Sequence, residues 1–383
     1  MKIAYLTPEY PHSKCTHSAG VGTSIYNLAH ALTKLGSEVR VLVYGQDEDE
    51  VFVEEGVYIY KIKNLKFKGI SRWLTQKKIE KLINNLHIQK KIELVEGIDW
   101  TGMTSFIKPK KCPIVIKLHG SDTYFCKLEG RPLKKKNFYH EKRALRKTDA
   151  HLSVSDFVAK KTNLFFNLNI HFTTVYNGVD VKRFQSSSNS ENPTTILYVG
   201  TLIRKKGVLD LAHIFNEVYK ANPSVKLVLI GKDASDIKTG ASSTWRLMKT
   251  IFASEALKQV DYRGKVPYDE VKSYLEKASV CVFPSYAEAF PVSWLEAMAM
   301  RKAIVASNIG WASEVINDGK EGFLIHPSNH HKFADKISLL INDESKRHKF
   351  GNQALIKIKH KFSNELIACK NIDFYQSVID RNI

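Results

Sequence analysis

Short apolar runs alternate with helical patterns along the first half of the chain. Residues 2–7 are typical of a buried strand, residues 24–32 carry apolar side chains at helical spacing, and residues 39–43 predict the next strand. Residues 113–118 and 150–154 are further short apolar runs that lie between helical stretches. Alternation of this kind predicts a parallel sheet that is flanked by helices.

A small polar segment interrupts this pattern near the middle of the chain. Residues 186–193 are rich in serine and asparagine and end in proline, so they form the predicted linker between two domains. The pattern then restarts, with predicted strands at residues 195–200, 225–231, 279–284 and 303–307. Two doubly wound α/β domains in tandem are therefore expected. Ligands of such folds bind outside the carboxyl ends of the strands, so the cleft between the domains is the expected site.

The composition agrees with a folded protein that binds an anionic partner. The chain has 383 residues, of which 43% are hydrophobic and 25% charged, and this excludes a disordered or fibrous protein. The formal net charge is +19, and most of the excess lies in residues 61–147. A basic region of this kind indicates nucleic acid, an acidic membrane surface or a phosphate-bearing ligand. Composition alone does not choose among the three.

The first residues and the cysteines favour a cytoplasmic protein. Residues 1–9 contain no apolar stretch of the length that a secretory signal needs, and no window approaches 18 uninterrupted apolar residues. The five cysteines are scattered without a C-x-x-C pair, which argues against a disulfide framework or a zinc ribbon. They are therefore expected to be free thiols: Cys15, Cys112, Cys126, Cys281 and Cys369.

Two predicted turns have the character of phosphate-binding sites. Gly20 and Gly22 lie between a strand and a helix, where glycine lets a ligand approach the backbone and the helix N-terminus attracts an anion. A purely structural turn is the alternative for these glycines. Arg204, Lys205 and Lys206 directly follow a predicted strand, and such a cluster suits a diphosphate. The alternative for this cluster is a solvated basic turn.

Residues 284–300 carry two glutamates around a predicted helix start. Pro291 is well placed as the first helical residue, so Glu288 is expected in the preceding loop and Glu296 inside the helix. The backbone N–H groups of such a loop suit a phosphate, and carboxylates can accept hydrogen bonds from sugar hydroxyls. Without further context, a capping acid and an exposed helix residue explain the two glutamates equally well.

The pair Glu288 and Glu296 within AEAFPVSWLEAMA resembles the signature of retaining GT-B glycosyltransferases, specifically glycosyltransferase family 4. The resemblance extends along nearly the whole chain. Further matching segments are GVG at 20–22, HGSD at 119–122, NGVD at 177–180, GKV at 264–266, GWASEVI at 310–316 and DGKEGFL at 318–324.

The resemblance implies a fold and a domain division. It implies the α/β GT-B fold, with two Rossmann-like doubly wound domains facing across a cleft and a C-terminal helix that returns to the N-terminal domain. Residues 1–185, with about 363–383, would bind the acceptor, and residues 186–193 would be the linker. Residues 194–362 would bind the nucleotide-sugar donor.

The resemblance also implies a role for individual residues. Glu288 would contact the transferred sugar, and His119 would lie near the sugar and the acceptor, so these two are the implied catalytic residues. Glu296 would hold the ribose, Lys206 and Arg204 the diphosphate, and Val266 the base. The full set of implied donor-binding residues is Gly22, Arg204, Lys206, Val266, Ala289, Phe290, Pro291, Val292 and Glu296.

Three points qualify the implied site. The family often has arginine where this chain has Thr201, so Arg204 would have to make that phosphate contact from three residues further on. His119, as a lone histidine after an apolar strand, could instead be a hydrogen-bonded structural residue. No D-x-D motif ends a strand, so no metal is expected, and the cations of residues 204–206 would take its place. The expected co-substrate is a UDP- or GDP-linked sugar.

Part of the basic region interleaves cations with apolar residues. Residues 61–91 include Phe67 and Trp73 among many lysines, and Lys134–Lys136 add a second basic patch. This pattern suits the interface of an anionic membrane, although a solvated helical face is the alternative. Residues 61–147 are therefore the candidate for a peripheral contact with the inner face of the cell membrane.

The expected function is that of a cytoplasmic, retaining glycosyltransferase, in the hexosyltransferase class, that acts on a glycan or lipid-linked acceptor. Bacterial cell-surface polysaccharide or glycolipid synthesis is the expected setting. One alternative is a basic nucleic-acid-binding protein, although no known binding motif is present. Another is a non-catalytic membrane-bound protein on the same fold, which would have no need of the two glutamates and the basic turn.

Overall fold

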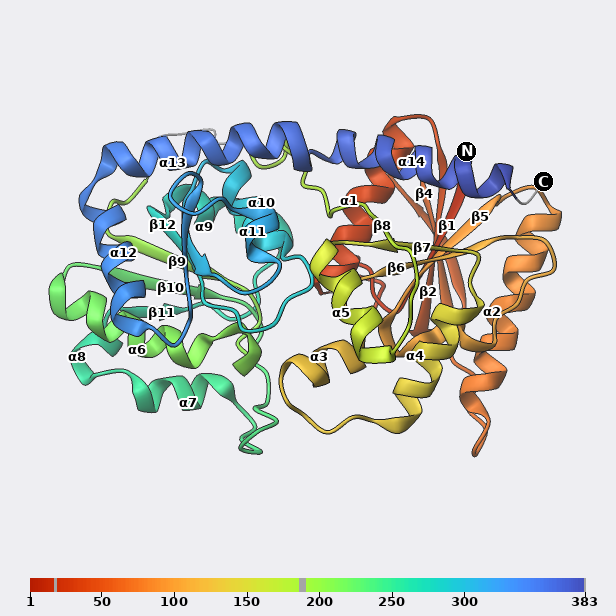
Figure 1. Ribbon diagram of the computed structural model, residues 1–383, viewed down its shortest axis with the longest axis horizontal. Helices are drawn as coiled ribbons and strands as arrows, with labels where there is room; N and C mark the ends of the chain where they lie inside the picture. Colours follow the sequence, from red (N-terminus) through yellow and green to blue (C-terminus); the bar gives the residue numbers. More distant parts are fainter. Residues whose placement is uncertain (17–18, 186–190, 382–383) are drawn as a thin grey trace. The chain divides into compact units, whose positions relative to one another are not determined.

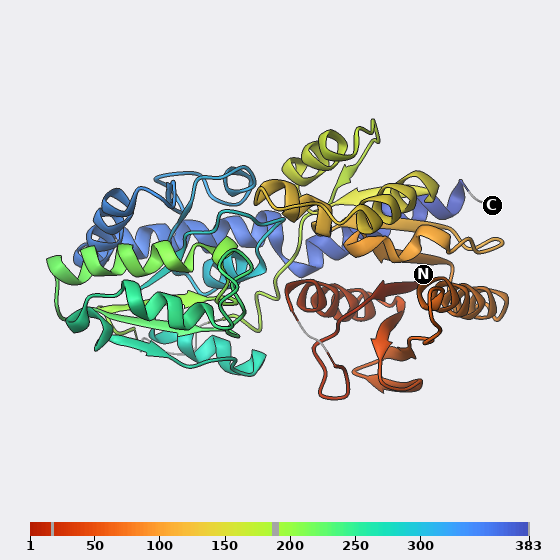
Figure 2. The same cartoon turned by 90° about the horizontal axis from the view of Figure 1, so that it is seen from below.

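The computed structural model describes residues 1–16, 19–185 and 191–381. The chain divides into two compact units. Unit 1 comprises Met1–Gly178 and Phe362–Ile383, and unit 2 comprises Val179–Lys361. Both chain ends lie in unit 1 (Figures 1 and 2).

The strands of unit 1 form one sheet in the order β3-β4-β2-β1-β5-β6-β7-β8. Every neighbouring pair is parallel except the antiparallel pair β3 and β4. The strands are β1 Lys2–Thr7, β2 Glu38–Gln46, β3 Glu50–Glu54, β4 Val57–Lys63, β5 Leu94–Ile98, β6 Ile114–Leu118, β7 Ala150–Ser153 and β8 Thr173–Thr174. The carboxyl ends of the parallel strands, and the loops that follow them, therefore share one edge of the sheet.

Helices cover both faces of this sheet. On one face, α1 and the C-terminal α14 pack on apolar residues of β1, β2 and β5. On the other face, α2 packs through Ile79, Ile83 and Leu86. The helical segments are α1 Gly20–Lys34, α2 Ser71–Ile88, the 3₁₀ segment η1 Trp100–Phe106, α3 Asp122–Leu128, α4 Lys135–Lys147, α5 Asp156–Phe166 and α14 Asn364–Asp380.

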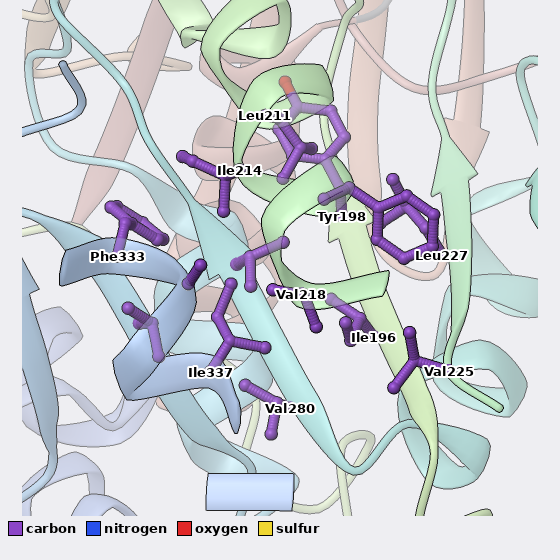
Figure 3. Close-up of a cluster of buried hydrophobic side chains, with 14 of the residues drawn as sticks. Ile196, Tyr198, Leu211, Ile214, Val218, Val225, Leu227, Val280, Phe333 and Ile337 are labelled. Carbon is purple, nitrogen blue, oxygen red and sulfur yellow. The ribbon is translucent and has the colours of Figure 1, made fainter. Parts of the chain in front are cut away.

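Unit 2 contains a parallel sheet in the order β11-β10-β9-β12-β13-β14. Its strands are β9 Thr195–Val199, β10 Lys226–Ile230, β11 Val260–Tyr262, β12 Val280–Phe283, β13 Ala303–Ser307 and β14 Gly322–Ile325. Its helical segments are η2 Arg204–Lys206, α6 Val208–Ala221, α7 Thr244–Ile251, α8 Ser254–Leu257, η3 Tyr268–Glu270, α9 Val271–Lys277, α10 Val292–Ala299, α11 Ala312–Val315, α12 His330–Asn342 and α13 Glu344–Lys357. Figure 3 shows apolar side chains of α6 and α12 that pack on β9, β10 and β12.

The predicted fold class is confirmed. Each unit has a doubly wound parallel sheet, and the C-terminal helix belongs to unit 1, where the Asn364 side chain donates a hydrogen bond to the Asn27 carbonyl over 3.4 Å. The units divide at Gly178 and Val179, before the predicted linker 186–193, of which residues 186–190 lie outside the described residues. The segment after Gly178 packs with unit 2, because the Phe184 ring contacts the Tyr268 ring and Arg183 pairs with Asp269.

The glycine segment near the N-terminus differs from the prediction of a loop. Helix α1 begins at Gly20, so Gly22 lies in its first turn. The Gly22 N–H donates to a carboxylate oxygen of Glu9 over 2.9 Å. Since the first N–H groups of a helix have no partner within the helix, a carboxylate from the loop after β1 satisfies one of them and allows the helix to start early.

Candidate active site

The basic turn of unit 2 lies against the loop that follows β12. Gly207 closes the turn with a φ of +68°, and a Cβ on this residue would lie 1.8 Å from the Pro284 carbonyl oxygen. Only glycine therefore allows this close approach. The Tyr286 N–H donates to the Lys205 carbonyl over 2.8 Å and fixes the two segments together. Two segments that the sequence singled out separately thus form one site at the carboxyl edge of the sheet.

Lys206 and Glu288 form an ion pair at the centre of this site. The Lys206 ammonium contacts Oε1 of Glu288, and the Ser285 hydroxyl donates to the same oxygen over 3.0 Å. The exposed fractions of the two side chains are 22% and 9%, so the pair is largely removed from water. An ammonium beside a partly buried carboxylate provides both a cation for a phosphate and an acceptor for sugar hydroxyls.

Arg204 is held by an acid that the sequence reasoning missed. Its guanidinium donates two hydrogen bonds to the Asp236 carboxylate, over 2.8 and 2.7 Å. The Thr239 hydroxyl donates a third over 2.6 Å, and together these bonds hold the pKa of Asp236 well below its usual range. Arg204 is thereby fixed in place, while the ammonium of Lys206 points to the loop of Glu288.

The loop of Glu288 leads directly into helix α10. Ala289, Phe290 and Val292 are buried, and Pro291 occupies the capping position, so the helix begins at Val292, one residue later than predicted. The first turn of α10 contains no acidic side chain. Its N-terminal dipole is consequently not neutralised by a carboxylate from its own first turn, which suits an anionic ligand.

Glu296, inside α10, is a buried carboxylic acid. Its side chain accepts a hydrogen bond of 2.7 Å from the Tyr268 hydroxyl, and burial raises its pKa to about 7. Arg183 stacks its guanidinium over the Tyr268 ring, 4.2 Å from the ring centre. Val266 lies two residues before Tyr268 on the same loop, so the structure brings the predicted base-binding residue and the predicted ribose-binding residue to neighbouring segments.

The unit 1 candidate His119 directly follows β6 and is buried. Its backbone N–H donates to Oδ1 of Asp99 over 2.8 Å. Burial, and the nearby Lys117, lower its pKa to about 3, so the imidazole is neutral at pH 7. Within the described residues its Nε2 atom has no hydrogen-bond partner. A buried ring nitrogen without a partner is a candidate contact for a hydroxyl-rich ligand.

Asp99 is a second buried acid at this edge, and the sequence reasoning missed it. Burial raises its pKa to about 7, and Oδ2 has no hydrogen-bond partner in the described part of the chain. Glu141 lies nearby and accepts hydrogen bonds from the N–H groups of Thr101, Asp122 and Thr123. The position of Asp99 directly after the apolar run 94–98 was a signal available in the sequence.

The two units contribute separate parts of the predicted set. Unit 2 brings together Arg204, Lys206, Val266, Glu288 to Val292 and Glu296 at one sheet edge. Gly22 and His119 belong to unit 1, where each follows the carboxyl end of a strand. The Gly22 N–H is bound by Glu9 in this structure.

Comparison with known proteins identifies the family. The family model described as Glycosyltransferase Family 4 matches residues 18–183, and the model described as Glycosyl transferases group 1 matches residues 180–356. The chain is a glycosyltransferase with the GT-B fold. The two matches meet close to Gly178 and Val179, where the two units of this glycosyltransferase divide.

Full-length relatives and solved structures agree with this identification. An uncharacterized glycosyltransferase of Methanocaldococcus jannaschii is 27% identical over 95% of each chain. Sucrose-phosphate synthase from Thermosynechococcus elongatus covers 100% of both chains with a TM-score of 0.80 and 17% identity. Anabaena HepE, solved in complex with UDP-glucose, has a TM-score of 0.74 and 17% identity, and covers 98% of this glycosyltransferase and 100% of the HepE chain.

The side chains and helices of the described residues also bear on metal binding and on membrane spanning. Among the described residues, no group of three or more His, Cys, Asp and Glu side chains is arranged to hold a metal ion. In the same part of the glycosyltransferase, no helix is both long and apolar enough to span a bilayer.

Proposed function

We propose that this glycosyltransferase transfers a sugar, with retention of its anomeric configuration, from a UDP- or GDP-linked donor to a glycan or lipid-linked acceptor. The contact between Lys206 and Glu288 at the carboxyl edge of unit 2 carries the proposal, because a cation that suits a diphosphate lies beside a carboxylate that can accept hydrogen bonds from a sugar. HepE has been solved with UDP-glucose, which supports the donor class. The proposed setting is synthesis of a bacterial cell-surface polysaccharide or glycolipid at the inner face of the membrane.

Each predicted site residue of unit 2 has a proposed part in donor binding. Lys206, with Arg204 on the same turn, compensates the charge that develops on the departing diphosphate, without a metal ion. Glu288 accepts hydrogen bonds from the transferred sugar, and Glu296 accepts them from the ribose. The backbone of residues 289–292 meets the phosphate and sugar, and Val266 lies against the base.

Unit 1 has a proposed part in sugar and acceptor binding. His119 offers a neutral Nε2, and Asp99 offers an unpartnered carboxylate oxygen, so both can hydrogen-bond hydroxyl groups. Gly22, in the first turn of α1, is proposed to approach the donor phosphates. Basic residues within 61–147 are proposed to meet an anionic membrane that presents a lipid-linked acceptor.

A screen of nucleotide sugars by thermal shift tests the donor class. The true donor is expected to raise Tm because it binds only the folded protein, by the equivalent of about 2.7 kcal/mol at a hundredfold excess over Kd. A UDP- or GDP-sugar should be the strongest ligand and should then support transfer or hydrolysis. If no nucleotide sugar raises Tm and none is consumed, the proposed function is wrong.

The pKa of Glu296 predicts that donor affinity depends on pH. The ionised carboxylate accepts hydrogen bonds from ribose hydroxyls, and a protonated acid must first lose its proton. Affinity should therefore rise from pH 6, through the pKa of about 7, and level off near pH 8. At one pH unit below the pKa, the affinity should be up to about tenfold lower than at high pH.

Calorimetric titration at several pH values measures this dependence. A nucleotide sugar is a suitable probe because it lacks the terminal phosphate whose second pKa lies at about 6. The variant Glu296→Gln should bind more weakly and show no such rise. A wild-type affinity that is flat from pH 6 to pH 8 would exclude Glu296 as the titrating ribose ligand.

A further inference from the structure

One loop of unit 1 exposes several apolar side chains together. The loop Asn64–Ile70 joins β4 to α2, and Leu65, Phe67 and Ile70 are 40%, 63% and 45% exposed. Trp73, in the first turn of α2, is 47% exposed. Four large apolar side chains within nine residues form a patch of the kind that marks a binding surface.

The exposure does not arise from a loose loop. The Ser71 hydroxyl accepts a hydrogen bond from the Phe67 N–H over 2.7 Å and donates one to the Phe67 carbonyl over 2.6 Å. The Leu65 N–H donates to the Thr75 hydroxyl over 3.0 Å. The loop is therefore folded onto the start of α2 while its apolar side chains face water. Because exposing apolar side chains to water is unfavourable, the free energy falls when another surface covers the loop.

The charges in and around this loop select an anionic surface as the partner. Lys66 and Lys68 alternate with the apolar residues, are exposed, and form no ion pair with an acid in the described residues. Lys61 and Lys78, by contrast, are already paired with acids, Lys61 with Glu48 and Glu50 and Lys78 with Asp49. Alternating lysines and aromatic or aliphatic residues match the boundary between lipid headgroups and acyl chains.

The loop is also tied to the unit 1 part of the candidate site. Strand β4 belongs to the parallel set, so Asn64–Ile70 leaves the same sheet edge as Asp99 and His119. Arg72 donates a hydrogen bond to the Thr101 carbonyl, two residues after Asp99. Gln76 donates to the Met103 carbonyl over 2.9 Å. A surface that covers the loop would thus lie next to the edge of the unit 1 sheet that carries Asp99 and His119.

The second basic patch of the sequence is less available for such a contact. Arg131 pairs with Glu129, Lys134 lies 3.9 Å from Asp122, and Phe138 stacks on Phe166 of α5. Phe138 is used in packing within unit 1, and Tyr139, 54% exposed, is the large exposed aromatic side chain beside these cations, whereas residues 64–73 expose four large apolar side chains. The region expected to contact a membrane is therefore narrowed from residues 61–147 to residues 64–73.

We propose that residues 64–73 form a docking element that inserts Leu65, Phe67, Ile70 and Trp73 at the headgroup boundary of an anionic lipid bilayer, while Lys66 and Lys68 bind lipid phosphates. The element holds unit 1 at the membrane surface, where a lipid-linked acceptor reaches the edge with Asp99 and His119. The docking deepens the proposed membrane contact, and only the identity of the acceptor rests on the proposed function.

Sedimentation with vesicles of defined composition tests the docking element. The full-length protein should pellet with phosphatidylglycerol-containing vesicles and not with pure phosphatidylcholine vesicles, and salt should weaken binding. The variant Phe67→Ser/Trp73→Ser should lower the partition coefficient at least tenfold. The variant Lys66→Glu/Lys68→Glu should lower it about thirtyfold or more.

Ile88→Ser is the matched control for the apolar variant. Ile88 is 75% exposed at the other end of α2, about 22 Å from Trp73 along the helix. This control should bind vesicles as the wild type does. The proposal is overturned if the control loses as much binding as Phe67→Ser/Trp73→Ser, or if that double variant binds vesicles normally.

Two other occupants of the patch are distinguished in the same experiment. Light scattering that shows a dimer, lost in Phe67→Ser/Trp73→Ser, would assign the patch to a second copy and overturn the proposal. Salt-sensitive binding of single-stranded nucleic acid that is lost in the same variant, without vesicle binding, would also overturn it. The donor-induced rise in Tm is measured without vesicles and should be intact in all docking variants, so failure of docking and failure of the transferase function are separate results.

Discussion

Replacing Lys206 with alanine is expected to lower kcat for sugar transfer by about a hundred- to a thousandfold. Bond breaking at the sugar builds negative charge on the departing diphosphate, and removal of one preorganised charge-stabilising group costs about 2.7–4 kcal/mol in the transition state. The Lys206 ammonium is largely buried beside Glu288, so water replaces it poorly. Initial rates with the donor found in the thermal-shift screen measure the effect.

Two variants on the same position and turn separate catalysis from folding. Lys206→Ala leaves Glu288 without its cation, so a lower Tm is expected, whereas Lys206→Arg keeps the charge and should keep more of both activity and stability. Lys205→Ala removes the adjacent charge but keeps the carbonyl that bonds Tyr286, and its rate should fall less than tenfold. A folded Lys206→Ala enzyme within about fivefold of the wild-type kcat would rule out this role.

The sequence predicted the fold class because the strands that it identified are defined locally, although β3, β4, β5, β8, β11 and β14 were not predicted. Residues 2–7 and 195–200 are apolar runs next to glycine or proline, and both became central strands, β1 and β9. The parallel order follows from the alternation with helices, since parallel neighbours need a crossover. The return of α14 to unit 1 followed from the family resemblance alone, because no local pattern indicates which sheet a terminal helix will cover.

The partners of the site residues were not predictable in this way. Asp236 binds Arg204 from the loop after β10, and Tyr268 binds Glu296 from the start of η3. Such contacts depend on how two distant loops meet, and nothing in the spacing of either segment specifies the other. Gly22 illustrates the same limit, because the Glu9 carboxylate that caps its N–H is set by the path of the chain after β1.

A buried polar network ties α14 to the sheet of unit 1. The Tyr375 hydroxyl donates to Glu96 of β5 over 2.6 Å and lies 3.2 Å from Oδ1 of Asn371. Lys117 of β6 donates to the same Asn371 oxygen over 3.4 Å. Burial raises the pKa of Glu96 and lowers that of Lys117, and each charge favours the ionised form of the other. Inside the core, the ionised form of Glu96 is therefore stabilised by Lys117, and that of Lys117 by Glu96.

Lys117→Met is expected to destabilise unit 1 by about 3–5 kcal/mol, because it leaves the Glu96 carboxyl as an uncompensated buried acid. The Tm should fall by roughly 10 °C, and amide exchange in β5 and β6 should accelerate. The double variant Glu96→Gln/Lys117→Met should recover most of the loss, since an uncharged pair needs no partner of opposite charge.

The loss of stability in Lys117→Met should depend on pH. A carboxyl whose pKa is raised by folding stabilises the native state below its unfolded pKa, and that stabilisation is lost as the pH rises through the folded pKa. Without Lys117 the pKa of Glu96 rises further, so the defect of Lys117→Met should grow from pH 5 to pH 8, while the double variant shows no such growth. Calorimetric Tm values across this range measure both variants. A double variant as unstable as the single variant would show that Lys117 contributes through packing of its alkyl chain and not through its charge.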